Sequence, residues 1–320
     1  MAVVDPLIAA EVSFDATPNR KGSRRAMLRA LVRSGTGMFG ALMLTIIAVA
    51  AIFEPLIRPH DPAAQNLADR LKPPVLFGGH VTHFLGTDQL GRDLLSRLLE
   101  GARASMAIGL AVVAIAGTFG IVMGLLAGYY GGIVDTVIMR VADMQLAFPG
   151  ILLALVILYA IGPSAKLVVI VLAINGWMVY ARVVRSTVLS LRKSEYVEAA
   201  EIGGSRPARI MVRHILPNIA SPVLTLLVLE FARIILAEAA LSFLGYGVQP
   251  PGSSWGLIIG QGQDYLETAW WLVAIPGILI SLTVLSANLL ASWLRIYADP
   301  KLREKQLGHQ LDALMPGRRA

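Results

Sequence analysis

Long stretches of this sequence contain few charged side chains or none. Residues 104–134 hold no Asp, Glu, Lys or Arg in 31 positions, and about 20 apolar residues in a helix already cross the ~30 Å hydrocarbon core of a bilayer. Five further stretches have this character: 38–57, 144–165, 167–184, 219–245 and 268–294. Because a helix satisfies its own backbone hydrogen bonds in lipid, we predict six transmembrane helices rather than strands.

The composition agrees with a membrane protein. Of the 320 residues, 56% are hydrophobic and 15% charged, whereas a soluble domain is about 45–50% apolar and about 25% charged. These values exclude an ordinary soluble domain and a disordered chain. Cysteine is absent, which excludes disulfides, thiolate-bound metals and a cysteine nucleophile. The expected fold class is an all-α membrane protein.

The basic residues predict which loops face the cytoplasm. The formal net charge is +7, and 19 of the 28 Lys and Arg residues fall before residue 37, in 182–213, or from Arg295 onward. Six spans with a cytoplasmic N-terminus place these three segments on one side, which is the positive-inside pattern. The positive charge therefore indicates topology, and we expect no nucleic-acid partner. Both termini are expected to be cytoplasmic.

These patterns divide the chain into five parts. A basic cytoplasmic tail is expected at 1–36, the first transmembrane helix at 37–57, and an external loop at 58–105. Within that loop, leucines cluster on one side of Gly91–Ser105, which predicts an amphipathic helix lying at the membrane surface before the second span. A five-helix core is expected at 106–294, with a cytoplasmic loop at 185–217. A second basic cytoplasmic tail is expected at 295–320.

The cytoplasmic loop at 185–217 has the signals of two short helices. Ser194 is a suitable N-cap for a helix with acidic residues in its first turns. Gly203 and Gly204 are typical of a helix end, and Pro207 is typical of the first turn of the next helix. We therefore predict a rigid helix–turn–helix projection rather than a slack loop.

This loop resembles the EAA loop of ABC importer permeases. The match consists of Glu198-Ala199-Ala200, Gly204 four residues later, and His214-Ile-Leu-Pro217. Two more stretches, Leu85–Ser105 and Glu238–Gly256, are similar to the C-type permease subunit of the dipeptide/oligopeptide (or nickel) transport family. The resemblance implies a type I ABC importer permease architecture with six transmembrane helices.

The resemblance also implies partners and a role for the loop. In that family two permeases form the path, two ATP-binding subunits drive it, and an extracytoplasmic substrate-binding protein delivers the cargo to the bacterial cytoplasmic (inner) membrane. The ATPase-coupling residues implied here are Glu195, Glu198, Ala199, Ala200, Gly204, Arg209 and Pro217. The chain has no phosphate-binding loop or hydrolase motif, so we predict a non-enzyme whose partner subunits hold ATP and magnesium.

Two alternatives concern the cargo and the energy source. The same machinery could carry nickel or another small solute instead of peptides. A different class is an ion-driven secondary transporter, which would use the carboxylates within the spans; against it, no inverted repeat is visible in the sequence.

Three charged residues, Glu230, Arg233 and Glu238, interrupt the fifth apolar stretch. Charges at membrane depth are costly and face a cavity or a protein neighbour. They are expected either to line the translocation path or to form a structural pair, Glu230 with Arg233, together with a contact to the partner permease.

The glycines and tryptophans in or near the spans suggest roles in helix packing and in anchoring at the membrane interface. Gly120, Gly124 and Gly128 recur every fourth residue, which predicts close helix packing, placed here at the seam between the two permeases. Trp255, Trp270, Trp271 and Trp293 are expected to be interface anchors. The five histidines are scattered, so no metal site is expected, and His60, His80 and His83 are interpreted as surface residues.

Overall fold

The computed structural model describes residue 27 and residues 29–298. Within this range the chain is helical, with no β-strand beyond one isolated bridge between Thr87 and Asp93. This confirms the all-α prediction. Most of the tail expected at 1–36 and nearly all of the tail expected at 295–320 lie outside the described residues.

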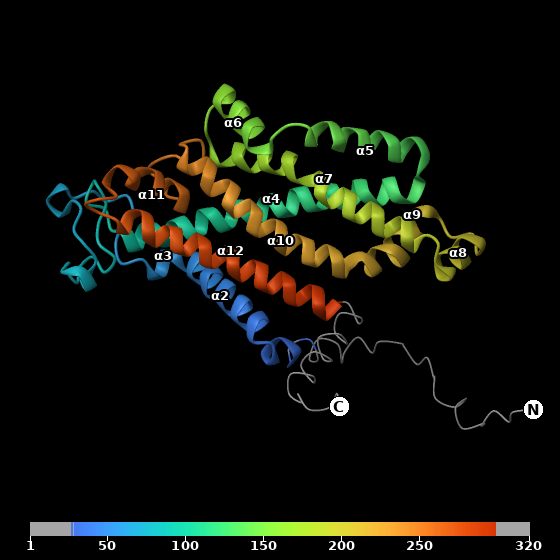
Figure 1. The fold of residues 1–320 in the computed structure, drawn as a ribbon, viewed down its shortest axis with the longest axis horizontal. Helices are drawn as coiled ribbons and strands as arrows, with labels where there is room; N and C mark the ends of the chain where they lie inside the picture. The colour runs from blue at the N-terminus through green and yellow to red at the C-terminus, as the bar shows by residue number, and fades with distance from the viewer. Residues whose placement is uncertain (1–26, 28, 299–320) are drawn as a thin grey trace, which may run out of the picture.

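In the described part of the chain, five long helices run along the long axis of the molecule (Figure 1). They are α2 (Gly35–Ile52), α4 (Leu94–Tyr130), α7 (Ala165–Leu191), α10 (Leu216–Phe243) and α12 (Trp271–Ala298). The α10 helix continues α9 (Pro207–Ile210) through one π-helical turn (Met211–Ile215), so that Pro207–Phe243 forms one rod. Each is long and apolar enough to cross a membrane.

The third expected span, 144–165, is not one straight helix. The chain instead forms α5 (Gly132–Leu146) and α6 (Gly150–Ile161), which bend by 80° relative to each other. Pro149 explains the break, because a proline disfavours helical geometry in the residue before it. At about 1.5 Å per residue, the 12-residue α6 spans roughly 18 Å and is too short to cross alone. The pair makes a sixth crossing only if the two helices act as one broken span.

The amphipathic segment at 91–105 is also organised differently from the expectation. It does not form a separate surface helix, because α4 begins at Leu94 and runs 37 residues without a break into the second span. At about 1.5 Å per residue this helix is roughly 55 Å long, so it extends well beyond a ~30 Å apolar core. Its first turns are buried by protein, since Leu94 and Leu98 are 0% and 3% exposed.

The short elements lie at the two ends of the molecule. One end carries α3 (Glu54–Ile57), the turns Leu67–Asp69 and Val75–Phe77, and α11 (Trp255–Gly262) followed by the turn Gln263–Tyr265. The other end carries α8 (Glu195–Ile202) and α9 (Figure 1). The predicted external segment and the predicted cytoplasmic projection are therefore at opposite ends.

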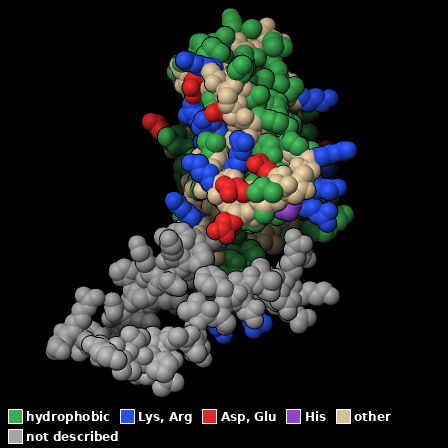
Figure 2. Space-filling model, turned by 90° about the vertical axis from the view of Figure 1, so that its right-hand side faces the viewer, with side chains coloured by type: hydrophobic (Ala, Val, Ile, Leu, Met, Phe, Trp, Pro, Cys, Tyr) green, Lys and Arg blue, Asp and Glu red, His purple; other side chains and the backbone are tan. Residues whose placement is uncertain are grey.

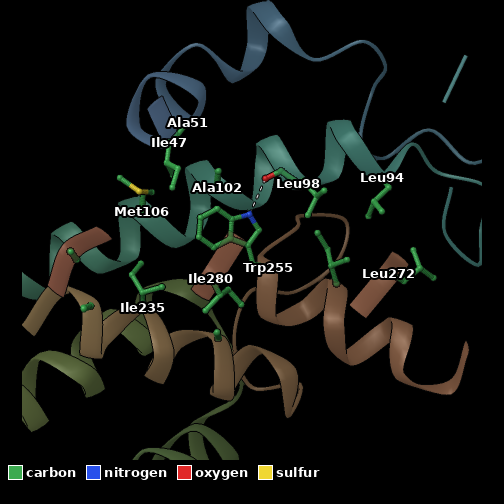
Figure 3. Close-up of a cluster of buried hydrophobic side chains, with 14 of the residues drawn as sticks. Ile47, Ala51, Leu94, Leu98, Ala102, Met106, Ile235, Trp255, Leu272 and Ile280 are labelled. Atoms are coloured by element: carbon green, nitrogen blue, oxygen red, sulfur yellow. Dashed lines mark hydrogen bonds between the residues drawn. The ribbon is translucent and has the colours of Figure 1, made fainter. Parts of the chain in front are cut away.

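The core at the α11 end is built around Trp255 (Figure 3). This side chain is 1% exposed, and its indole N–H donates to the Leu98 carbonyl at 3.1 Å. Trp271 is 4% exposed and donates in the same way to the Thr87 carbonyl at 3.2 Å. The expectation that these two tryptophans anchor the membrane interface is wrong, because protein covers them.

The glycine stripe packs within this chain. A Cβ atom on Gly120 would lie 2.3 Å from the Trp177 carbonyl oxygen, and one on Gly124 would lie 2.6 Å from that of Ala181. Gly128 faces Val188 in the same way, at 2.7 Å. All three neighbours are on α7, so the stripe allows α4 and α7 to approach closely. The expectation of packing fits this arrangement, but the seam is α4–α7 and not a second permease.

Candidate functional site

The α8 helix is fixed to the body of the molecule by one buried side chain. Val197 is 0% exposed and belongs to a cluster with Val188 of α7, Ile210 of α9 and Ile215 of the π-helical turn. An 8-residue helix is not stable on its own in water. Packing on both adjoining helices therefore holds α8, so that it must move with them.

The end of α8 follows from its two glycines. The Ser205 N–H donates to the Ala200 carbonyl at 3.1 Å, and the Gly204 N–H donates to the Glu201 carbonyl at 3.0 Å. These two bonds define a Schellman motif, and Gly204 takes the left-handed conformation that it requires, at φ +73°. At the other end, Ser194 is the N-cap residue, but its hydroxyl bonds the Leu191 carbonyl and does not cap the helix.

Polar contacts between α8 and α4 complete this attachment. The Tyr129 hydroxyl at the end of α4 donates to Glu201 Oε1 at 3.2 Å. Arg192 donates from Nη1 to the Tyr129 carbonyl at 2.7 Å, and its guanidinium lies 5.4 Å from the centre of the Tyr129 ring. Three helices therefore hold α8.

Among the described residues, nothing covers the outer face of α8. Glu195, Glu198, Ala199 and Gly204 are exposed, whereas Ala200 is half-buried against the body. Arg209 in α9 and Pro217 in the first turn of α10 are also exposed. The end-on view in Figure 2 shows acidic and basic side chains interleaved across this face. The structure thus brings Glu195–Gly204 onto one projection and places Pro217 on the adjoining rod.

Within the helices, Glu230 and Arg233 form the expected ion pair. Arg233 Nη2 lies 2.6 Å from Glu230 Oε2, with Glu230 buried and the Arg233 side chain 54% exposed. Arg233 opens onto a pocket of ≈ 160 Å³ that is also lined by Gly150 of α6 and Asn175 of α7. The Asn175 amide donates to the Gly150 carbonyl at 3.2 Å, which ties α6 to α7 beside this pocket.

Glu238 does not share this surface. It is 0% exposed, and its carboxylate accepts from the Ser105 hydroxyl at 2.9 Å and the Ser242 hydroxyl at 2.7 Å. The expectation that it lines the path or contacts another subunit is therefore wrong, because α4 covers it. Serine donors on α4 and on the next turn of α10 satisfy a carboxyl group that would be costly to bury alone.

A buried polar network at the opposite end was missed by sequence reasoning. Arg97 is 1% exposed, pairs with Asp88, and donates from Nη2 to Gln261 Oε1 at 2.8 Å. Asp88 also accepts from Arg92 Nε at 2.7 Å. This network joins the start of α4 to α11. Gln261 lies 164 residues after Arg97 in the chain, so no local pattern in the sequence indicates that contact.

His60 and His80 are exposed, as expected of surface residues, whereas His83 is half-buried. His60, His83 and Asp93 each offer one ligand atom, and these atoms lie within 4.8 Å of one another. Sequence spacing could not reveal this group, because 22 residues without a long helix separate the two histidines. Of the described residues, no other group of three or more His, Asp and Glu side chains has this geometry.

Comparisons with known proteins agree with this architecture. Residues 120–304 match the family described as binding-protein-dependent transport system inner membrane component. Residues 24–74 match the family described as the N-terminal TM domain of oligopeptide transport permease C.

Individual relatives match over most of their length. A putative peptide transport system permease protein of Brucella suis is 41% identical over 296 residues, covering 92% of this chain and 98% of the relative. A di/tripeptide transport system permease protein of Pseudomonas aeruginosa is 43% identical over 265 residues, 82% and 88% of the two chains. A dipeptide transport system permease protein of Haemophilus influenzae is 36% identical over 268 residues, 83% and 91%.

Proposed function

Because this chain belongs to the family of inner membrane components of binding-protein-dependent transport systems, we propose that it is the permease subunit of a bacterial importer for di- and oligopeptides. It works in the inner membrane as a multi-pass protein. The peptide-transport names of its relatives favour peptides over nickel or another small solute as cargo.

The main support for this proposal is the way in which α8 is attached to the membrane helices. Its outer face is exposed and charged, while Val197 and the Tyr129–Glu201 hydrogen bond fix it to α4, α7 and the Pro207–Phe243 rod. A partner that pulls on α8 therefore moves three membrane helices together, since packed elements transmit displacement with little compression. An ion-driven transporter needs no such projection.

The need for separate ATP-binding subunits follows from the absence of a nucleotide-binding motif in this sequence. It has no phosphate-binding loop, so separate ATP-binding subunits hold ATP and magnesium and hydrolyse the nucleotide, while this chain has no enzymatic activity. A second permease completes the path, and an extracytoplasmic binding protein supplies the peptide. From the positions of the basic residues we infer that both termini and α8 lie on the cytoplasmic side.

Substitution on the outer face of α8 tests the coupling. Ala199→Trp adds a large side chain to an exposed position, so it should leave the thermal stability of the purified chain unchanged and abolish peptide-stimulated ATP hydrolysis by the assembled complex. Leu76→Trp is the matched control, because Leu76 is 85% exposed at the opposite end. If the Ala199→Trp complex retains full peptide-stimulated ATP hydrolysis, α8 is not the docking site of the ATP-binding subunits.

Single-cysteine labelling tests the sidedness independently. Since the chain has no cysteine, Ala199→Cys and Leu76→Cys each carry one thiol. A membrane-impermeant maleimide added to intact spheroplasts should label residue 76 and not residue 199, and inside-out vesicles should reverse the result. Labelling of residue 199 from outside contradicts the proposed topology.

Arg233 is proposed to meet the peptide or the second permease. Its exposed guanidinium stands over the pocket formed by α6, α7 and α10, and a guanidinium binds a carboxylate such as a peptide C-terminus. In Arg233→Glu, normal assembly with loss of transport assigns the residue to the path. Loss of assembly assigns it to the contact between subunits.

A further inference from the structure

Three side chains from separate parts of the external segment meet above the start of α4. His60 comes from the chain after α3, His83 from the turn before α4, and Asp93 is the N-cap residue of α4. His83 Nδ1 lies 3.0 Å from Asp93 Oδ1, and His60 Nδ1 lies 3.8 Å from Asp93 Oδ2. The two imidazole rings are 5.0 Å apart between centroids.

We propose that His60, His83 and Asp93 form a binding site for a divalent transition-metal ion, best matched by zinc, which fastens the segment after α3 onto the start of α4. This site is independent of the proposed transport function.

The distances fit a metal centre. Zinc binds imidazole nitrogen and carboxylate oxygen at about 2.0–2.2 Å in tetrahedral geometry, which places neighbouring ligand atoms about 3.3 Å apart. The two contacts to Asp93, at 3.0 and 3.8 Å, lie on either side of that value. The remaining separation between ligand atoms is at most 4.8 Å, and the His60 side chain is 40% exposed, so protein does not enclose it.

Other polar groups orient two of the three ligands. Asp93 Oδ2 accepts from the Ser96 backbone N–H at 2.9 Å and from its hydroxyl at 2.8 Å, which fixes the carboxylate. His83 Nε2 lies 3.8 Å from Asp69 Oδ2, so a metal on Nδ1 leaves Nε2–H pointing toward a carboxylate. Such a carboxylate behind a ligating histidine is the usual support of a zinc site. The Ser96 hydroxyl also accepts from the His60 backbone N–H at 3.1 Å.

Charge and space also favour a cation. A second carboxylate, Asp69, lies beside the three ligands and forms an ion pair with Lys72. With neutral imidazoles the cluster of Asp69, Asp93 and Lys72 carries one net negative charge, which a divalent ion offsets. A pocket of ≈ 310 Å³, lined in part by Asn66 and Thr82, opens beside the three ligands and leaves room for a water in the fourth position.

The donor set selects the type of ion. Imidazole and carboxylate together suit zinc and other first-row divalent ions, while calcium and magnesium prefer oxygen ligands alone.

His80 is a matched control among the described residues, because it lies in the same segment, is exposed, and is not one of the three ligands.

The test uses the full chain, purified in detergent without a histidine tag and stripped with EDTA. We expect the wild type and His80→Ala to bind one equivalent of zinc by calorimetry and mass spectrometry, and zinc to raise the melting temperature of both. His60→Ala and His83→Ala should lose at least ~100-fold in zinc affinity, since changes behind the ligands already cost about 10–100-fold. Asp69→Asn should fall in that smaller range.

Asp93→Asn separates metal binding from helix capping. Asparagine caps a helix about as well as aspartate, so this variant should fold and still lose the zinc-dependent rise in melting temperature. The proposal is overturned if the wild type binds no zinc, or if the His60→Ala, His83→Ala double variant binds zinc as tightly as His80→Ala does. Calcium and magnesium should produce no shift.

Discussion

The contact between α4 and α7 allows one substitution to be worked out quantitatively. In Gly120→Ala, the new Cβ lies 2.3 Å from the Trp177 carbonyl oxygen and 2.7 Å from Tyr180 Cβ, whereas ordinary contact begins at 3.4 Å. The backbone oxygen cannot rotate away, so the two helices must separate by about 1 Å. Overpacking of this kind costs roughly 1–3 kcal/mol, and we expect about 2 kcal/mol of destabilisation.

The assay is the melting temperature of the purified chain in detergent. For a chain of 320 residues, a loss of about 2 kcal/mol corresponds to a drop of roughly 3 °C. Gly277→Ala is the matched control, because this glycine also lies inside a long helix, α12, and a Cβ there meets nothing within 4 Å. The control should be neutral or stabilised by up to about 1 kcal/mol.

The same experiment separates the two possible locations of the glycine stripe. If the stripe formed the seam with a second permease, Gly120→Ala would leave the isolated chain as stable as the wild type and would weaken only the assembled complex. An unchanged melting temperature of the isolated chain therefore refutes the reasoning.

Three further substitutions test other contacts by the same thermal measurement. Arg97→Met removes the cation that pairs with buried Asp88 and should cost about 3 kcal/mol; a neutral result means that Arg92 alone neutralises this carboxylate. Trp255→Phe removes the indole hydrogen bond to the Leu98 carbonyl, which keeps its donor within α4, and should cost about 0.5–1.5 kcal/mol; stability equal to the wild type shows that the indole bond contributes nothing. Gly204→Ala should cost about 1–2 kcal/mol from its left-handed backbone alone, with Gly204→Asn closer to wild type; similar stability for Ala and glycine argues against the Schellman end of α8.

Sequence reasoning worked where a property is local. Charge-free stretches located the five long helices, because the cost of crossing lipid depends on the residues within each stretch. The Glu230–Arg233 pair followed from three-residue spacing on a helix, and the structure contains it. The two glycines after α8 likewise indicated its end, since left-handed backbone favours glycine.

Sequence reasoning failed where the burial of a side chain depends on residues that are distant in the sequence. The sequence suggests that Glu238 faces the path or another subunit and that Trp255 anchors the membrane interface. In the structure, neighbouring helices cover both side chains. The break near Pro149 was overlooked because the hydrophobicity of 144–165 is continuous even though the backbone is not.

The class of fold, the long helices and the family can be predicted from the amino-acid sequence, because apolar length, charge sidedness and motif spacing are local properties of one chain. Three further features require the folded chain: the helix that each glycine faces, the burial of Glu238, and the convergence of His60 and His83 on Asp93. Those outcomes depend on distances between residues far apart in sequence, and burial and ligand geometry exist only after the helices and the irregular external segment have packed together.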